Sequence, residues 1–461
     1  MKMQLAEIAN ALGLEAQPEY DQVTVTSVSF DSRKLKEGAL FVPLMGNNDG
    51  HEYIDSARKN GAVATLWQAD HKQDRPGDFP ALVVDDTLDA LQKLAHYYLQ
   101  KINPKVVAVT GSNGKTTTKD MTAAILSRGF NVQKTHANFN NQIGVPMTIL
   151  TMEPNTEILV VEMGMDHFGE LDHLSKLVSP DVAIITMIGE AHIEFFGTRD
   201  RIADAKMEIT HGLKEDGLLV YQGDEPLLRE RTKDLVQSTM TFGTNKGDDL
   251  EARNVVGSGN ETSFRVNKWP DENFTIPMIG TYNVNNALAA LCVGDHFQIP
   301  VADMLAALKD FSRTKNRTEW IKGAQGEEIL SDVYNSNPTA VKEVLHAFEN
   351  DVQTKGKRIV VLGDMLELGD QGPALHAGLA KYINPASISS VYLCGPVMKN
   401  LADALKDKMP EGTVHHYATD EKEQLTADLQ KEISRGDLVL IKGSHGIHLE
   451  KVLAALTGNE N

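Results

Sequence analysis

Residues 106–128 constrain the fold more than any other stretch, and they read VVAVTGSNGKTTTKDMTAAILSR. The apolar run before Thr110 is typical of a buried strand, and the apolar spacing after Lys115 is typical of a helix. Between them lies a flexible turn made of Gly111, Ser112, Asn113 and Gly114. Because unpaired amides at a helix N-terminus bind anions, this order of strand, glycine turn and helix predicts a cradle for phosphate groups.

This phosphate loop differs from the strict Walker A motif, because Val109 stands where that motif has its first glycine. Lys115 is placed to reach the terminal phosphates of a nucleotide, and the hydroxyl of Thr116 is placed to hold a magnesium ion. Thr117 continues the start of the helix. The alternative is an ordinary glycine turn with a surface lysine. The richness of TGSNGKTT and its strand-to-helix context favour nucleotide binding.

Composition bounds the kind of protein. A length of 461 residues suggests about three domains, since domains usually hold ~100–200 residues. Hydrophobic residues make up 41% and charged residues 24%, which argues against large-scale disorder. The formal net charge of −19 argues against nucleic-acid partners and against docking on anionic lipid. Any anionic substrate must therefore be bound by a local cluster of cations.

Cysteine usage and hydropathy point to a compartment. The two cysteines, Cys292 and Cys394, allow no disulfide framework and no CxxC metal site, which fits a reducing cytosol. No apolar run approaches the ~20 residues that cross a bilayer, so we expect no membrane insertion. The sequence therefore predicts a cytoplasmic protein.

Strand-like and helical stretches alternate along the chain, which predicts an α/β protein of three domains. We expect a small N-terminal α/β domain (1–102), a central P-loop-type ATPase domain with a mostly parallel sheet (103–312), and a C-terminal Rossmann-like doubly wound domain (313–461). Residues 241–277 are expected to add antiparallel strands. The expected strands elsewhere are 23–25, 39–42, 81–84, 106–110, 158–161, 182–185, 217–221, 329–330, 359–362, 391–393 and 438–441, and the clearest expected helices are 88–100 and 282–291.

Two polar residues follow strands of the central domain. Glu162 ends the apolar run 158–161, and a carboxylate delivered beside a phosphate loop suits magnesium. The alternative is an acid that caps the next turn. His192 follows the strand 182–186, and spacing alone leaves a structural histidine and a metal ligand equally open.

Lys206 shares a helix face with the apolar residues Ile202, Ala205 and Ile209. The ordinary explanation is a lysine whose stem is buried and whose ammonium group reaches water. The alternative is a desolvated, neutral amine that reacts with carbon dioxide. The resulting carbamate would act as a carboxylate-like magnesium ligand.

In these features the sequence resembles the Mur ligases, the ATP-dependent amide-forming enzymes of peptidoglycan precursor synthesis. The resemblance covers essentially the whole chain: TGSNGKTT matches the ATP loop, and EMG with Glu162, the His192 segment and the Lys206 helix match the magnesium residues. It implies ATP, two Mg²⁺ ions and a carbamylated Lys206, with Thr116 and Glu162 on the first ion and His192 and Lys206 on the second. The implied catalytic residues are Lys115, Thr116, Glu162, His192 and Lys206.

Four stretches, NFNNQIGVP, EMGMDHFGEL, YNSNP and GDMLELG, resemble the branch of the family that adds D-alanyl-D-alanine to UDP-N-acetylmuramoyl-tripeptide. The Asp-Asn-Pro motif of the third-residue-adding branch is not found. The resemblance implies substrate binding by Asn138, Asn140, Asn141, Asn335 and Asn337, and by Ser29, Asp31, Ser32 and Arg33 near the uridine. It implies ATP binding by Gly111, Ser112, Asn113, Gly114, Lys115, Thr116, Thr117, Asn283, Asn286, Arg317 and Asp332.

Two residues depart from the family pattern. Tyr282 replaces the more frequent histidine before Asn283, and His445 replaces the arginine of Lys-Gly-Ser-Arg, so a permanent cation becomes a titratable one. No charge role is transferred to His445.

The resemblance implies that ATP converts a carboxylate to an acyl phosphate, which the amine of D-alanyl-D-alanine attacks. Such a mechanism needs no covalent nucleophile, and the sequence offers no persuasive Ser/His/Asp or Cys/His set. We expect a monomer that acts on small molecules. Three alternatives stay open: a third-residue-adding Mur ligase, a folylpolyglutamate synthase, and a nucleotide-gated binding protein without catalysis.

Overall fold

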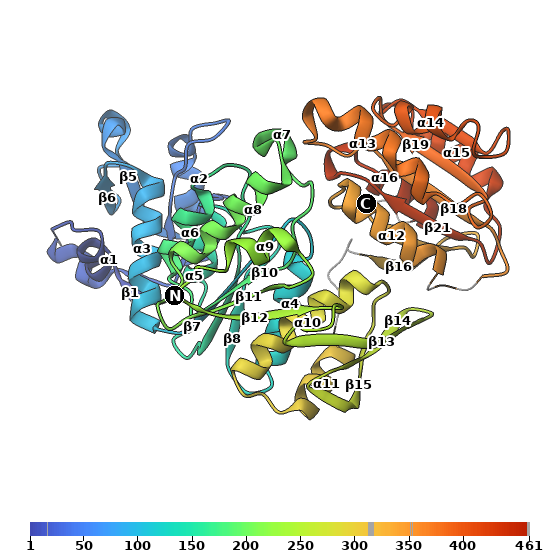
Figure 1. Ribbon diagram of the computed structural model, residues 1–461. Coiled ribbons are helices and arrows are strands. Elements are labelled where there is room, and N and C mark those ends of the chain that lie inside the picture. The colour runs from blue at the N-terminus through green and yellow to red at the C-terminus, as the bar shows by residue number, and fades with distance from the viewer. Residues whose placement is uncertain (16, 312–317, 351, 353, 459–461) are drawn as a thin grey trace. The chain divides into compact units, whose positions relative to one another are not determined.

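The computed structural model describes residues 1–15, 17–311, 318–350, 352 and 354–458. Strands and helices alternate along these residues, so the α/β fold class is confirmed (Figure 1). The chain divides into two compact units. Met1–Thr110, Gly129–Ala183 and Glu208–Leu218 form the first unit, and Gly111–Arg128, Ile184–Met207 and Leu219–Asn461 form the second.

The N-terminal region holds a four-stranded parallel sheet of order β3-β4-β5-β6 and a two-stranded antiparallel sheet of β1 and β2. Its strands are β1 (Met3–Gln4), β2 (Thr24–Val25), β3 (Ser27–Ser29), β4 (Ala39–Phe41), β5 (Ala62–Gln68) and β6 (Ala81–Val84). Its helices are α1 (Leu5–Ala11), η1 (Pro18–Gln22), η2 (Gly50–Tyr53), α2 (Ile54–Lys59), η3 (Ala69–Asp74) and α3 (Thr87–Ile102).

Strand β5 was not expected from the sequence, although it lies in the middle of this sheet. It reads AVATLWQ, and its two alanines weaken its strand signal. Tertiary structure compensates: Thr65 is fully buried, and its hydroxyl donates to the carbonyl of Phe41 on β4 at 3.2 Å. Burial against both neighbours, more than local propensity, makes this segment a strand.

The central region contributes a nine-stranded sheet of order β15-β14-β13-β12-β11-β10-β7-β9-β8. Its strands are β7 (Lys105–Thr110), β8 (Val132–Lys134), β9 (Ile158–Glu162), β10 (Val182–Ile185), β11 (Leu218–Gln222), β12 (Ser238–Gly243), β13 (Leu250–Ser258), β14 (Glu261–Val266) and β15 (Trp269–Ile276). Its helices are α4 (Lys115–Leu126), α5 (Gly144–Leu150), α6 (Glu170–Val178), α7 (Ile193–Phe196), α8 (Arg199–Met207), η4 (Glu208–His211), α9 (Pro226–Arg231), α10 (Thr281–His296) and α11 (Val301–Lys309).

Register in this sheet places the carboxyl ends of two parallel strands side by side. β7 pairs with β9, and Val109 lies opposite Glu162. The antiparallel addition expected within 241–277 is confirmed by the β13-β14-β15 meander. Helix α10 packs against α4 (Figure 1), and its alanine- and leucine-rich sequence is buried from Val284 to Gly294 apart from Asn285.

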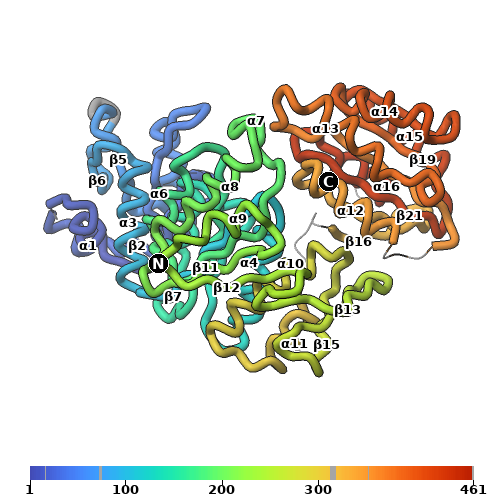
Figure 2. The backbone as a smooth tube through the Cα atoms, viewed as in Figure 1, coloured from blue at the N-terminus to red at the C-terminus, as the bar shows by residue number. Residues whose placement is uncertain are grey.

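The C-terminal region is a doubly wound unit around a six-stranded sheet of order β16-β17-β21-β18-β19-β20 (Figure 2), in which only β16 runs antiparallel to its neighbour. Its strands are β16 (Glu319–Lys322), β17 (Glu328–Asp332), β18 (Arg358–Gly363), β19 (Ser390–Cys394), β20 (Val414–Tyr417) and β21 (Leu438–Lys442). Its helices are α12 (Pro338–Asn350), η5 (Gly369–Gln371), α13 (Gly372–Gly378), η6 (Leu379–Tyr382), α14 (Lys399–Leu405), α15 (Lys422–Glu432), η7 (His445–Ile447) and α16 (Glu450–Thr457).

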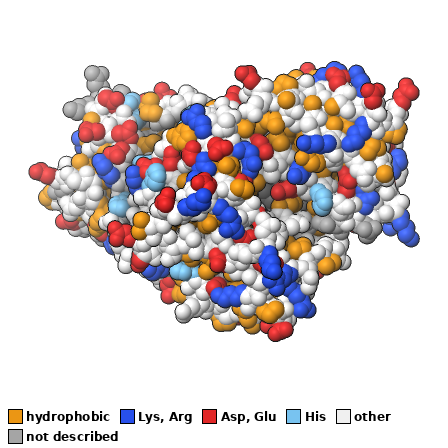
Figure 3. All heavy atoms as spheres, viewed as in Figure 1, with side chains coloured by type: hydrophobic (Ala, Val, Ile, Leu, Met, Phe, Trp, Pro, Cys, Tyr) orange, Lys and Arg blue, Asp and Glu red, His pale blue; other side chains and the backbone are white. Residues whose placement is uncertain are grey.

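Surface features agree with the composition. Acidic and basic side chains are interspersed on the face that Figure 3 shows. Among the described residues, no helix is long and apolar enough to cross a membrane. Cys292 and Cys394 are buried free thiols, and burial raises the pKa of both.

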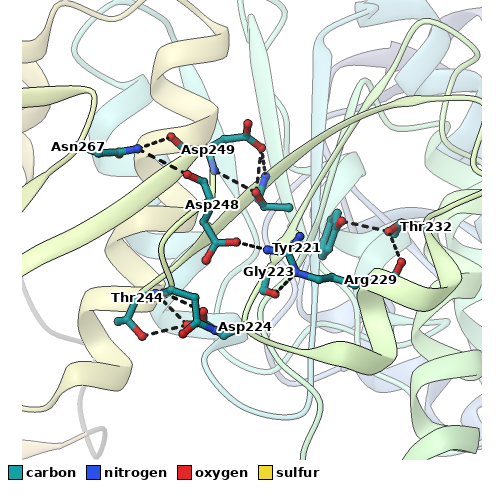
Figure 4. A network of polar contacts seen from close by, with 11 residues as sticks. Tyr221, Gly223, Asp224, Arg229, Thr232, Thr244, Asp248, Asp249 and Asn267 are labelled. Atoms are coloured by element: carbon teal, nitrogen blue, oxygen red, sulfur yellow. Dashed lines mark hydrogen bonds and ion pairs between the residues drawn. The ribbon is translucent and has the colours of Figure 1, made fainter.

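A buried carboxylate network holds the turn between β12 and β13 (Figure 4). Asp224 accepts hydrogen bonds from the backbone amides of Thr244 at 2.8 Å and Asn245 at 3.0 Å. Asp248, whose side chain is fully buried, pairs with Arg229 at 2.5 Å through one oxygen. Its other oxygen has no hydrogen-bond partner within the described part of the chain. Burial, followed by the negative charge of Asp224, raises the pKa of Asp248 to about 6.

This network predicts a pH-dependent stability. A carboxyl whose pKa is raised by folding stabilises the fold in its protonated form, so its contribution is present near pH 4 and is lost as the pH rises through about 6. An Asp248→Asn variant keeps the shape without the charge. At pH 7.5 we expect it to be more stable than the parent by on the order of 1–2 kcal/mol, and at pH 4.5 to differ little. Thermal unfolding at both pH values checks this, and equal pH slopes in the two proteins would contradict it.

Candidate active site

The phosphate loop joins β7 to α4 and is braced by the residues that follow β10. Thr186 donates to the carbonyl of Asn113 at 2.5 Å, and the amide of Gly189 donates to the hydroxyl of Ser112 at 2.9 Å. A Cβ at Gly111 would lie 1.8 Å from the Thr186 hydroxyl. The loop therefore needs glycine at this position for the backbone to pass so close to its neighbour.

The start of helix α4 also has the conformation of a phosphate cradle. Gly114 caps α4 with φ +82°, a conformation that side chains disfavour. Lys115 opens the helix and donates to the carbonyl of Gly111 at 2.8 Å, so its ammonium group lies over the loop. Thr116 is buried, whereas Thr117 is partly exposed. The strand, loop and helix expected from the sequence are thus present in that order.

Helix α10 supports the loop from the other side through two buried asparagines. Asn286 accepts from the Thr118 hydroxyl at 3.2 Å and donates to Asn283 at 3.2 Å, and Asn283 donates to the carbonyl of Ile279 at 2.8 Å. The Asn286 amide oxygen is also 2.3 Å from where a Cβ of Gly114 would be. The structure therefore places both asparagines in a chain of hydrogen bonds beside the phosphate loop.

Glu162 ends β9 as a buried carboxylate with one free oxygen. One oxygen accepts from the side-chain amide of Asn140 at 2.9 Å, and the backbone amide of Glu162 donates to Thr135 at 3.0 Å. The other oxygen is buried and has no hydrogen-bond partner among the residues described. A buried carboxylate oxygen of this kind fits a divalent cation, because magnesium prefers carboxylate oxygens. Asn140, expected to bind substrate, lies in direct contact with this group.

Lys206 is 2% exposed on α8, and Ile202, Ala205 and Ile209 are fully buried, as the helix face predicted. Burial, and then the positive charge of Lys115, lower the pKa of Lys206 well below its ordinary value. The lowered pKa favours the neutral amine form of Lys206. A neutral amine is the form that reacts with carbon dioxide.

His192 stands at the start of α7 in a left-handed conformation, with φ +63°. Its Nδ1 lies 2.5 Å from a carboxylate oxygen of Glu367, in the loop after β18. With Lys115, Thr116 and Lys206 it belongs to the second unit, whereas Glu162 belongs to the first.

In the C-terminal region, a buried lysine donates hydrogen bonds to polar groups near the end of the sheet's strands. Lys442, 1% exposed, donates to Asp332 at 2.5 Å and to the carbonyl of Asn335 at 2.8 Å. Asn337 and Asn113 exchange side-chain hydrogen bonds of 2.7 and 3.1 Å, which joins the YNSNP segment to the phosphate loop. Arg317 lies outside the described residues.

The two departures from the family pattern have structural counterparts. His445 is exposed and stacks on Tyr334 with ring centres 5.9 Å apart, so its ring lies against an aromatic face. Tyr282 is within 3.3 Å of the Thr318 hydroxyl. Burial and the charge of Asp332 raise the pKa of Tyr282, which keeps its hydroxyl protonated.

The residues expected near uridine form an exposed turn. Arg33 binds both oxygens of Asp31, at 2.9 and 3.0 Å, and lowers the pKa of that carboxyl to about 2. The Ser29 hydroxyl accepts from the Asp31 amide at 3.1 Å. Ser32 is buried, and its carbonyl accepts from Asn60 at 2.8 Å.

The aromatic pair Phe30 and Phe139 was missed by the sequence analysis. The two rings are 6.3 Å apart and partly exposed. They bring the uridine turn next to the segment that holds Asn138 and Asn141. Asn138 is exposed, while the side-chain oxygen of Asn141 accepts from the Gly144 amide at 2.9 Å, at the start of α5. Only the folded chain shows this pairing, since the rings are far apart in sequence.

The fold and the site define a phosphate-loop nucleotide-binding protein. Three Mur ligase domains match the chain: the family's catalytic domain at residues 24–99, the middle domain at 109–294, and the glutamate ligase domain at 316–445. The chain belongs to the Mur ligase family.

Individual relatives agree along nearly the full length. The UDP-N-acetylmuramoyl-tripeptide--D-alanyl-D-alanine ligase of Bacillus subtilis is 42% identical over 96% of each chain. A crystal structure of MurF from Acinetobacter baumannii matches with a TM-score of 0.86 and 28% identity, covering 99% of each chain. MurF from Thermotoga maritima in complex with ADP matches with a TM-score of 0.81 and 30% identity, covering 94% of this chain and 98% of that one.

The packing of the phosphate loop predicts the effect of one methyl group. In a Gly114→Ala variant, the left-handed conformation is disfavoured by about 1–2 kcal/mol. The methyl group would also meet Asn286. We expect affinity for an ATP analogue to fall by more than about tenfold, measured by titration calorimetry. Gly412→Ala is the matched control, since Gly412 has φ +81° with nothing within 4 Å of its Cβ position. Equal nucleotide affinities in the two variants would contradict the prediction.

Proposed function

We propose that the protein joins D-alanyl-D-alanine to UDP-N-acetylmuramoyl-tripeptide with hydrolysis of ATP to ADP and phosphate. The observation that carries the proposal is 42% identity, over 96% of the chain, to a relative that bears the name of this activity. The phosphate loop, the unpartnered buried oxygen of Glu162 among the described residues and the lowered pKa of Lys206 support it, because they supply the parts that ATP-driven ligation needs.

The proposed reaction has two chemical steps. The terminal carboxylate of the tripeptide attacks the γ-phosphorus, the bond to the bridging oxygen breaks, and ADP leaves. The amine then attacks the acyl phosphate carbon, loses a proton, and phosphate departs from the tetrahedral intermediate. No step needs a covalent nucleophile of the protein, so its task is positioning and charge neutralisation. Lys115, which lies over the loop, would neutralise the transferred phosphoryl group.

The residues fit two magnesium ions. Thr116 and Glu162 would hold one ion, and His192 and a carbamylated Lys206 would hold the other. Magnesium supplies neutralisation of phosphate charge when it is bound. Carbamylation forms a bond between Nζ of Lys206 and the carbon of carbon dioxide and releases a proton, which turns a buried amine into a carboxylate-like ligand. The lowered pKa of Lys206 supports this step.

We also propose the ligand contacts and the domain roles that the resemblance implies. ATP would contact residues 111–117, Asn283, Asn286 and Asp332, with Arg317. The substrates would contact Ser29, Asp31, Ser32, Arg33, Asn138, Asn140, Asn141, Asn335 and Asn337. The domain bounds 1–102, 103–312 and 313–461 would separate the UDP-substrate, ATP and C-terminal functions. We also propose a monomer in the cytoplasm, where these small molecules occur.

A defined reaction tests the proposal. The protein is supplied with ATP, magnesium, UDP-linked tripeptide and one amine at a time: D-alanyl-D-alanine, glutamate, lysine or diaminopimelate. We expect ADP, phosphate and a product of the summed mass only with D-alanyl-D-alanine. Turnover with another amine would favour a third-residue-adding ligase or a folylpolyglutamate synthase. ATP binding without turnover would favour a binding protein, and formation of AMP would refute the acyl phosphate route.

A second prediction concerns the buried lysine. Lys206→Ala should lower the ligation rate by on the order of 100-fold or more, because it removes a ligand for a cation that neutralises phosphate charge. Lys206→Glu, which supplies a carboxylate directly, should retain more activity than the alanine variant. Native mass spectrometry of the parent should show the added mass of one carbon dioxide that is absent in both variants. Lys431→Ala, at an exposed lysine, serves as the control. Full activity of Lys206→Ala would end the carbamate assignment.

A further inference from the structure

Glu367 contacts the candidate metal ligand His192 but was not among the expected site residues. It lies in the loop between β18 and α13, and its carboxylate oxygen is 2.5 Å from His192 Nδ1. The distance is that of an ion pair. Within the described residues no hydrogen-bond partner reaches this nitrogen, so Glu367 is the group that meets it.

Two hydrogen bonds to backbone carbonyls join this loop to the turn that follows His192. The Glu194 amide donates to the Glu367 carbonyl at 3.1 Å, and the side chain of Gln371 donates to the Gly197 carbonyl at 2.9 Å. The turn at 192–197 and the loop at 366–371 are therefore held together at both ends. The meeting of His192 and Glu367 depends on the position of the whole loop.

Both members of the pair have disfavoured backbone conformations. His192 has φ +63° and Glu367 has φ +61°, in the left-handed region that few side chains adopt. Such residues persist when their surroundings fix them, and they concentrate at sites where a side chain must be aimed. Here the two strained residues face each other, which an ordinary surface ion pair does not require.

The chemistry of imidazole gives this contact a role. A carboxylate beside Nδ1 holds the proton on that nitrogen and leaves the lone pair of Nε2 for a cation. We propose that Glu367 is a positioning residue: it orients the imidazole of His192 so that Nε2 binds a divalent cation. The inference rests on the proposed function, in that His192 is taken as a metal ligand.

A consequence is that cation binding depends on the C-terminal loop. The loop 366–371 belongs to the doubly wound unit, whereas His192 follows the central strand β10. Withdrawal of the loop would free Nδ1 and let the ring turn. The alternative is a half-exposed surface ion pair, since Glu367 is 48% and His192 26% exposed, and such pairs usually contribute little.

A measurement of metal affinity distinguishes a positioning role of Glu367 from an ordinary surface ion pair. Mn²⁺ is titrated into the full-length protein bound to a non-hydrolysable ATP analogue, and free Mn²⁺ is followed by electron paramagnetic resonance. Glu367→Ala should weaken Mn²⁺ binding by about 10-fold or more, as loss of a carboxylate behind a histidine ligand usually does. Glu367→Gln should have a smaller effect, because it keeps a side-chain oxygen beside Nδ1. Nucleotide affinity without metal and the thermal midpoint should not change.

Two further variants make the test decisive. In a His192→Ala background, Glu367→Ala should cause no additional loss, because the residue acts only through the histidine. Glu450→Ala is the matched control, because it removes a carboxylate that lies 2.8 Å from Nδ1 of another histidine, His448, and it should leave Mn²⁺ affinity unchanged. Unchanged affinity in Glu367→Ala, equal losses in Glu367→Ala and Glu450→Ala, or additive losses with His192→Ala would each overturn the proposal.

Failure of this inference and failure of the proposed function are distinguishable. A protein that binds Mn²⁺ through His192 and Glu367 but does not ligate D-alanyl-D-alanine refutes the function and leaves the positioning role. A protein that ligates the dipeptide while His192→Ala keeps full Mn²⁺ affinity refutes the positioning role and leaves the function.

Discussion

The close approach of the phosphate loop to its neighbours is the constraint on which the rest of the site depends. Gly111 passes against the Thr186 hydroxyl and Gly114 against the Asn286 amide, at separations that leave no room for a Cβ. Because the loop is fixed from both sides, its geometry does not have to form when an anion arrives. Preorganised donors of this kind are effective because little reorganisation remains at the time of binding. The buried ends of β10 and α10 thus determine where the nucleotide phosphates can lie.

The burial of ionisable groups is the second feature on which the site depends. Lys206 has lost water on all sides and lies in the field of Lys115, so it holds its proton weakly. Glu162 has lost water around one oxygen and gained a single amide donor. A buried carboxylate oxygen with no hydrogen-bond partner among the described residues, and a buried amine that holds its proton weakly, are both costly to desolvate. The magnesium ions and the carbamate of the proposed function would offset this cost.

Much of the fold could be predicted from local pattern, and the exceptions have physical causes. The apolar strands β7, β9, β10 and β21 could be predicted, because parallel strands buried on both faces are nearly continuous in hydrophobic residues. Strand β5 could not, because its alanines have low strand propensity and the segment is fixed by pairing between β4 and β6. At the site, the loop and Glu162 followed from sequence. The pairs Phe30–Phe139, Lys442–Asp332 and His192–Glu367 did not, since their members are at least 100 residues apart.

By itself, the sequence determined that this is a three-part α/β protein with a glycine loop for phosphate, and which polar residues end the strands around it. These features depend on neighbours in the chain, through strand propensity, helix periodicity and the freedom of glycine. The tertiary structure decided which of those residues are buried, charged or aimed. It lowered the pKa of Lys206, left one oxygen of Glu162 without a hydrogen-bond partner among the described residues and set Glu367 against His192. Protonation and orientation depend on groups that arrive from distant parts of the chain, and no local pattern contains that information.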